Sequence, residues 1–227
     1  MKNIKGVIFD LDHTLFDRYS TFIALQNDFY NAFKKYLSDE TTPRDMCIAL
    51  KNGDKKFLYY GWDKIAEYVF GLGLFSVNIS AKEFKEIVFS CFEKKAIPFE
   101  YSIPVLDKLK SNGYKIGLIT NGKSQLQRKK LLMLNLDNKF DEIIISGEFW
   151  KHKPDLTIFY EMSKRLKISE EKMIYVGDHP INDIDAASKA GYKTVWVKTN
   201  GTWIDGCTTP DFSIDTVKSL PSLLGID

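Results

Sequence analysis

Asp10-Leu-Asp-His-Thr14 follows the apolar run Gly6-Val-Ile-Phe9 and continues into Leu15-Phe16-Asp17. An apolar run this short, bounded by polar residues, is typical of a buried parallel strand. Asp10 and Asp12 are therefore expected just past the carboxyl end of a strand, where open α/β sheets bind their ligands. Two carboxylates this close repel each other unless a cation or a shared proton compensates. Hard oxygen ligands favour Mg²⁺ as that cation.

Strand and helix patterns alternate through the second half of the chain. Short apolar runs predict strands, and apolar residues at three- and four-residue spacings predict the helices between them. The predicted strands are 7–9, 115–120, 142–146, 173–176 and 193–197, and the predicted helices are 105–109, 125–134, 156–166, 183–190 and 220–224. Strands that alternate with helices imply a parallel sheet with right-handed crossovers. We therefore predict an α/β fold with a doubly wound, Rossmann-like core.

The residues between the first strand and Pro98 have a helical pattern instead. Phe22, Leu25, Phe29 and Phe33 recur at helical spacing. Helix starts are predicted at Thr42-Pro43, with Pro in the first turn, and at Ser80, with Glu83 three residues later. We expect an all-helical cap domain over residues 18–96, inserted into a core domain formed by residues 1–17 and 97–227.

Three later segments place polar residues at the ends of predicted strands. Thr120-Asn-Gly122 offers a hydroxyl, an amide and a glycine at a strand-to-helix turn, which suits a bound anion and equally suits an ordinary loop. In Lys151-His-Lys153-Pro-Asp155 a lysine can neutralise carboxylates and bind phosphate, or the cluster is a solvated surface loop. Gly177-Asp178 and Asp183 add two carboxylates, of which Asp183 also suits a simple helix cap.

Together the four segments resemble the four motifs of the haloacid dehalogenase superfamily, in the order of that family. Asp10-x-Asp12-x-Thr14 is similar to the first motif, Thr120 to the second, Lys153-Pro-Asp155 to the third, and Gly177-Asp178 with Asp183 to the fourth. The resemblance covers about residues 5–197 and does not extend to the details of the helical insert. It implies a Mg²⁺-dependent phosphatase whose helical cap acts as a lid.

The resemblance also implies a role for each site residue. Asp10 is the nucleophile that forms an aspartyl-phosphate, and Asp12 is the general acid and base. The residues expected to bind the phosphoryl group are Thr120, Asn121, Gly122 and Lys153, of which Thr120 and Lys153 also take part in catalysis. The metal ligands are Asp10, Asp178 and the backbone carbonyl of Asp12, while Asp183 orients the lysine or a metal-bound water. Lys151 and His13 receive no catalytic role.

The substrate is less closely defined by the sequence. Thr120–Gln127 and residues 145–148 look most like the nucleoside 5′-monophosphatase branch, and acylneuraminate 9-phosphate phosphatases have similar segments. The aromatic residues Phe57, Tyr59, Tyr60 and Trp62 of the insert either stack on a base or belong to the cap core. A sugar-phosphate phosphatase and a phosphomutase are alternatives. Asp12 argues against a 2-haloacid dehalogenase, and receiver-type phosphoryl-binding switches are shorter and lack the insert.

Composition sets the remaining expectations. The formal net charge of +2 over 227 residues provides no basic field for nucleic acid. The three cysteines show no CxxC spacing and the three histidines show no zinc-site spacing, which is typical of a reduced protein without zinc. No signal peptide is recognised, and no apolar run is long enough for a membrane helix. We expect a cytoplasmic monomer or weak homodimer that acts on a small phosphorylated metabolite.

Overall fold

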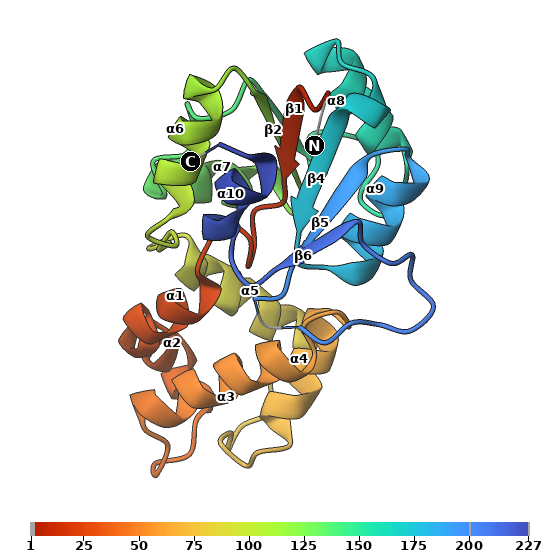
Figure 1. The fold of residues 1–227 in the computed structure, drawn as a ribbon. Coiled ribbons are helices and arrows are strands. Elements are labelled where there is room, and N and C mark those ends of the chain that lie inside the picture. Colours follow the sequence, from red (N-terminus) through yellow and green to blue (C-terminus); the bar gives the residue numbers. More distant parts are fainter. Residues whose placement is uncertain (1–2, 200, 227) are drawn as a thin grey trace. The chain divides into compact units, whose positions relative to one another are not determined.

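The chain is described here by a computed structural model that covers residues 3–199 and 201–226. Residues 1–2, 200 and 227, which belong to the predicted core range, lie outside the described part. The chain divides into two compact units, one formed by residues 1–17 and 98–227 and the other by residues 18–97 (Figure 1). We call them the core and the cap, and each is described by itself.

The described part of the core contains a sheet of six strands in the order β3-β2-β1-β4-β5-β6 (Figure 1). The strands are β1 (Gly6–Phe9), β2 (Lys115–Thr120), β3 (Glu142–Ile145), β4 (Met173–Gly177), β5 (Lys193–Val197) and β6 (Phe212–Ile214). Every neighbouring pair is parallel. The predicted doubly wound α/β core is thus confirmed. The strand order reverses between β1 and β4, and ligands of open α/β sheets bind at such a switch point.

Helices flank the strands of the core. They are α6 (Ser102–Ser111), α7 (Ser124–Met133), α8 (Thr157–Leu166), α9 (Ala186–Lys189) and α10 (Leu220–Leu224), with short 3-10 turns at Glu170–Lys172 and Val217–Ser219. Residues of α8 and α9 form one buried cluster with Ile8 and Tyr175 of the sheet. Right-handed crossovers on the two sides of a switch point lie on opposite faces of the sheet. The helices α6 and α7 therefore cover the face opposite to that of α8 and α9. The helix α10 contacts α6 (Figure 1).

Two elements of the core differ from the sequence prediction. The predicted helix 183–190 begins earlier, as a π-helical turn over Pro180–Asp185 that leads into α9. Nδ1 of His179 accepts hydrogen bonds from the backbone N–H groups of Ile181 and Asn182, so His179 caps this turn and Asp183 does not. Burial lowers the pKa of His179 to about 4, which keeps the ring neutral and able to accept these bonds.

The second difference is the edge strand β6, which the sequence did not predict. Three residues carry too little alternation for a pattern to be recognised. The position of this strand depends instead on Asp211, whose Oδ2 accepts a hydrogen bond of 2.9 Å from the backbone N–H of Thr194 in β5. The strand is therefore fixed by a tertiary contact that a local pattern does not record.

The described residues of the cap form helices and no strand. These are α1 (Arg18–Ala24), α2 (Gln26–Phe33), α3 (Pro43–Lys56), α4 (Trp62–Phe70) and α5 (Ala81–Phe92), with a 3-10 turn at Lys34–Tyr36. Both predicted helix starts are confirmed, because the Thr42 hydroxyl accepts from the N–H of Asp45 and the Ser80 hydroxyl from that of Glu83. At α3 the Asp45 side chain also accepts from the Thr42 N–H, which completes a capping box.

Aromatic side chains fill the interior of the cap. The ring of Phe22 lies 5.7 Å from that of Phe29 and 5.3 Å from that of Phe92, measured between centroids. Trp62 is half-buried and packs edge-on against Phe92 at the border of this interior. Tyr60, in contrast, is 70% exposed. The aromatic residues of the insert are therefore divided between the cap core and its surface.

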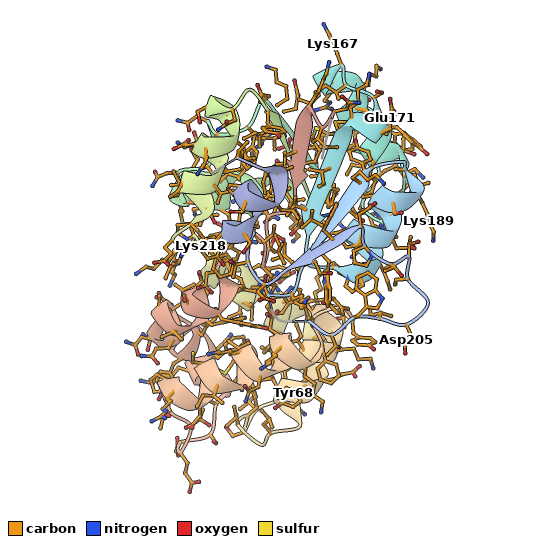
Figure 2. All side chains as sticks on the ribbon, viewed as in Figure 1. Tyr68, Lys167, Glu171, Lys189, Asp205 and Lys218 are labelled. Carbon is orange, nitrogen blue, oxygen red and sulfur yellow. The ribbon has the colours of Figure 1, made fainter. Side chains whose placement is uncertain are left out.

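Many charged side chains lie on the surface of the core. Figure 2 shows Lys167, Glu171 and Lys189 pointing outward from the core, where all three are exposed. Among the described residues, no helix combines the length and the apolar character that crossing a membrane would require.

Candidate active site

The carboxyl ends of the core strands bring most of the predicted site residues together. Asp10 directly follows β1, Thr120 ends β2, and Asp178 directly follows β4. Asp183 lies in the π-helical turn after β4, and Lys153 lies in the loop between β3 and α8. All five side chains are buried. Within the described part of the chain, carboxylate oxygens of Asp10, Asp178 and Asp183 lie within 4.8 Å of one another.

Lys153 is hydrogen-bonded to two of these carboxylates. Its ammonium donates to Oδ1 of Asp10 at 2.7 Å, to Oδ1 of Asp183 at 2.6 Å and to the Tyr175 hydroxyl at 2.9 Å. Burial lowers the pKa of Lys153, but attraction to Asp10 and Asp183 outweighs it and holds the pKa well above its ordinary value. Lys153 is therefore a permanent cation in the site, suited to hold an anionic oxygen as a point charge.

The carboxylates carry more negative charge than Lys153 balances. Burial raises the pKa of Asp10, Lys153 opposes this shift and the charges of Asp183 and Asp12 add to it, so that the pKa lies at about 7. Lys153 supplies one positive charge to the three clustered carboxylates. Buried carboxylate oxygens with unbalanced charge are the donor set that a hard divalent cation prefers. The residues present therefore fit such an ion.

Gly177 leaves the space that the Asp183 side chain occupies. A Cβ on Gly177 would lie 2.5 Å from Oδ2 of Asp183, closer than real Cβ contacts. The same Oδ2 accepts a hydrogen bond of 3.0 Å from the backbone N–H of His179. With Lys153 on Oδ1, both oxygens of Asp183 are held. The absence of a side chain at the end of β4 thus allows Asp183 to reach Lys153.

Asn121 and Gly122 are engaged by the neighbouring loops. The Asn121 side chain donates to the carbonyl of Lys153 at 2.9 Å and accepts from the N–H of Lys153 at 3.0 Å. The N–H of Gly122 donates to the Ser146 hydroxyl at 3.0 Å. These polar groups fix the loop that carries Lys153. That Asn121 and Gly122 bind the phosphoryl group, together with Thr120 and Lys153, stays a prediction.

The carboxylate of Asp12 is held by α7. Lys130 donates to its Oδ1 at 2.7 Å, and Nε2 of Gln127 lies 3.1 Å from its Oδ2. The same Nε2 lies 2.6 Å from the Thr120 hydroxyl. Gln127 and Lys130 are only 1% and 5% exposed. They link the candidate general acid and the candidate phosphate-binding threonine to one helix.

Sequence reasoning missed Tyr175, Gln127 and Lys130. A usable signal was present for the last two, because they lie three residues apart in the buried stripe of α7, where apolar residues are the rule. Tyr175 is the polar exception in an otherwise apolar buried strand. A polar residue in a buried stripe or strand needs a partner, and here the partners are site residues.

The remaining expectations concern residues around the motifs. Lys151 forms an ion pair of 2.9 Å with Asp155 and is not among the partners of the buried carboxylates described above. His13 is buried and has a left-handed backbone conformation, with φ of 63°. The Thr14 hydroxyl is buried and has no hydrogen-bond partner among the described residues.

Comparison with known proteins agrees with this fold and site. Residues 7–197 match the family described as haloacid dehalogenase-like hydrolase. The glyceraldehyde 3-phosphate phosphatase of Methanocaldococcus jannaschii is 32% identical over 98% of this chain and 96% of that protein. The N-acylneuraminate-9-phosphatase of Rattus norvegicus is 35% identical, over 47% of this chain and 44% of that protein.

A solved structure supports the fold independently. The magnesium-bound crystal structure of YfnB from Bacillus subtilis superimposes with a TM-score of 0.80 and 18% identity, over 99% of this chain and 100% of that one. At this identity the likeness concerns the fold alone. By its motifs, its sheet topology and its match over residues 7–197, the chain belongs to the haloacid dehalogenase-like hydrolases and is an enzyme of their phosphatase type.

Proposed function

We propose that the protein is a Mg²⁺-dependent phosphomonoesterase that transfers the phosphoryl group of a small metabolite to Asp10 and then to water. The observation that carries the proposal is the buried arrangement of Asp10, Lys153 and Asp183, joined by hydrogen bonds of 2.7 and 2.6 Å. Phosphoryl transfer needs a nucleophile beside groups that neutralise the oxygens of the transferring phosphate. Asp10 and Lys153 have this relation at the switch point of the sheet.

The metal ion of this proposal would be held by the carboxylates of Asp10 and Asp178 and by the backbone carbonyl of Asp12, with Asp183 supporting them. A bound Mg²⁺ would neutralise negative charge on the phosphoryl oxygens and the nucleophile. The excess of buried carboxylate charge described above supports this assignment. It predicts that Asp178→Ala raises the Mg²⁺ concentration needed for half-maximal rate more than Asp183→Ala does, because the Asp183 oxygens already bind Lys153 and the His179 N–H.

The protein residues divide the proposed reaction into two steps. A carboxylate oxygen of Asp10 attacks phosphorus, the ester P–O bond breaks, and Asp12 gives its proton to the departing alkoxide. Asp12 then takes a proton from water, whose oxygen attacks the aspartyl-phosphate and releases inorganic phosphate and free Asp10. Lys153 and the Thr120 hydroxyl hold phosphoryl oxygens through both steps. The sum is hydrolysis of one phosphate ester by one water.

For the substrate we propose a small sugar phosphate or sugar-acid phosphate. The two curated relatives described above act on phosphorylated metabolites of this kind by their names, and one of them aligns with nearly the whole chain. A nucleoside 5′-monophosphate is the second candidate, which rests on the resemblance of the Thr120–Gln127 segment. In the cap, half-buried Trp62 already packs against Phe92, so part of its ring surface is engaged within the cap.

The test is hydrolysis by the purified full chain of a panel that contains p-nitrophenyl phosphate, glyceraldehyde 3-phosphate, a sugar-acid phosphate and nucleoside 5′-monophosphates. Each substrate is assayed with Mg²⁺ and with excess chelator. We expect phosphate release that requires the metal and a kcat/KM for one of the sugar substrates that exceeds that for every nucleotide. Nucleotides as the best substrates would replace the substrate assignment. Full activity in chelator would remove the metal from the mechanism.

A further inference from the structure

The helix α7 buries two polar side chains that the proposed chemistry does not require for binding substrate or metal. Lys130 is 5% exposed and Gln127 is 1% exposed, and both belong to the inward stripe of this helix. Buried lysines are rare unless their charge is paired. The pairing here is with Asp12, so the question is what this contact does for that residue.

Stability alone is a poor explanation for the contact. The side chains of Lys130 and Asp12 are 6% and 17% exposed, and Nζ also lies 4.9 Å from the ring centroid of Phe16. Transferring a lysine and a carboxylate from water to such a site has a desolvation cost that cancels most of the free energy of their attraction. An apolar residue in the stripe would pack there with no such cost. The ion pair therefore suggests a function in placing the carboxylate.

The contact distances indicate which oxygen of Asp12 is fixed. Oδ1 accepts the 2.7 Å bond from Lys130, whereas Oδ2 receives a longer contact of 3.1 Å from Gln127. The two amide hydrogens of Gln127 are shared among three acceptors, which are Asp12 Oδ2, the Thr120 hydroxyl and the Asn121 carbonyl. Of these two contacts from α7, the one to Oδ2 is the longer, which favours Oδ2 as the oxygen that carries a proton to a leaving group.

Gln127 orients Thr120 in the same arrangement. Its Nε2 lies 2.6 Å from the Thr120 oxygen, which must accept in this bond because the amide nitrogen can only donate. The hydroxyl proton of Thr120 then points to another acceptor, as binding of a phosphoryl oxygen requires. One helix face thus sets the orientation of both the candidate acid and the candidate phosphate donor.

We infer that Lys130 is a positioning residue for the phosphatase reaction, which fixes Oδ1 of Asp12 so that Oδ2 faces the leaving oxygen. The inference rests on the proposed function, since it assigns a partner to the proposed general acid. It requires that loss of Lys130 lower kcat/KM for substrates whose leaving group needs a proton, and leave kcat/KM nearly unchanged for substrates whose leaving group does not. A purely structural role would lower kcat/KM for both kinds of substrate equally.

The test compares kcat/KM of Lys130→Met for p-nitrophenyl phosphate and for an alkyl phosphate such as glycerol phosphate. The value of kcat/KM depends only on the steps up to the first irreversible one, which is release of the alcohol. The later attack of water therefore does not affect it. General acid catalysis contributes about 10²–10⁴-fold. We expect a loss of roughly 10–100-fold for the alkyl ester and less than about threefold for the nitrophenyl ester.

Three further variants make the result specific. Lys129→Met removes the same charge from the exposed neighbouring position of α7 and should leave the ratio of the two kcat/KM values unchanged. In an Asp12→Asn background, Lys130→Met should have no further selective effect, because the residue acts through Asp12. Lys130→Gln removes the charge but keeps a shorter donor at the same position; it replaces Lys130→Met should that variant not fold, and its selective loss for the alkyl ester should have the same direction and be smaller.

The outcomes separate this inference from the proposed function. If the wild-type chain hydrolyses neither ester, the proposed function fails and the inference fails with it. If the wild type hydrolyses both and Lys130→Met loses equally on both, or on neither, only the positioning role is overturned. A rise in kcat/KM for the alkyl ester would show that Lys130 restrains Asp12 and would overturn the inference as well.

Discussion

At the scale of single residues, the site depends on carboxylates that are buried close to one another. Each of Asp10, Asp178 and Asp183 would be costly to bury alone, because an ionised carboxylate loses its hydration inside a protein. Lys153 offsets part of that cost through two short hydrogen bonds. The remaining negative charge supports the proposed cation, and Asp10 lies beside Lys153, the proposed ligand of a phosphoryl oxygen.

The first prediction concerns Asp10. Asp10→Asn keeps the shape of the side chain and removes the nucleophile, so kcat should fall by roughly three or more orders of magnitude. The fold should survive, because the change removes a buried charge and leaves Lys153 its bond to Asp183. Steady-state hydrolysis of p-nitrophenyl phosphate and circular dichroism measure the two effects. A kcat near the wild-type value would exclude Asp10 as the nucleophile.

A second prediction concerns the space beside Asp183. In Gly177→Ala the new Cβ would meet the Asp183 carboxylate at 2.5 Å, so this side chain must move away from Lys153. We expect a loss of about 1–3 kcal/mol in unfolding free energy from overpacking, together with a fall of at least tenfold in kcat. Gly71→Ala is the control, because its nearest neighbours would lie 3.5 Å away and its backbone allows a side chain. Wild-type activity in Gly177→Ala would show that the position of Asp183 is unimportant.

At the scale of elements, the sequence predicts regular strands well and the turns that carry the site less well. The bounds of β2 and β5 agree with the predicted ranges 115–120 and 193–197, because each strand is a compact apolar run that ends in a polar residue or a turn. The start of the helix after β4 was misplaced by three residues. Histidine is not a usual N-cap residue, so the sequence pattern does not mark His179 as the cap of this turn.

In the site as well, the sequence predicts some features and not others. The four motifs mark the ends of the strands, so the sequence identifies the residues that converge there. It does not show that Asn121 binds the loop of Lys153, because the partner groups are backbone atoms 32 residues away. Nor does it show that Lys130 reaches Asp12, since that contact depends on how α7 packs on the sheet. Contacts between elements decide which polar side chains are available for chemistry.

A prediction at this scale tests the link between the β2 loop and the β3 loop. Asn121→Ala removes both hydrogen bonds to the backbone of Lys153, so unfolding free energy should fall by about 1–3 kcal/mol. We expect kcat to fall as well, because Lys153 then loses its fixed position. The control is Asn112→Ala, which removes one exposed bond to the Lys108 carbonyl at the end of α6. A raised KM with unchanged kcat would instead indicate that Asn121 binds substrate directly.

At the scale of the whole molecule, the buried Asp10 carboxyl links folding stability to pH, and the proposed metal would add a second dependence. The ordinary pKa of an aspartate, 3.8, applies to Asp10 in the unfolded chain, whereas burial raises the pKa to about 7 in the native protein. Between these values the native state without metal binds a proton that the unfolded state has released. The stability of the metal-free protein must therefore fall as pH rises through this window. A cation that binds the ionised carboxylates competes with that proton.

This competition gives the last prediction. In protein first freed of metal with a chelator, saturating Mg²⁺ should raise Tm more at pH 8 than at pH 5.5, because Asp10 is ionised at the higher pH and mostly protonated at the lower one. Mg²⁺ at 100 times its Kd contributes about 2.7 kcal/mol, which corresponds to a rise of roughly 5–10 °C for a chain of this size. Asp10→Asn is the control: it should lose most of the Mg²⁺ effect, and its metal-free Tm should decline less between pH 5.5 and 8. Equal shifts at both pH values, or an undiminished shift in Asp10→Asn, would show that Mg²⁺ does not bind at the Asp10 carboxylate.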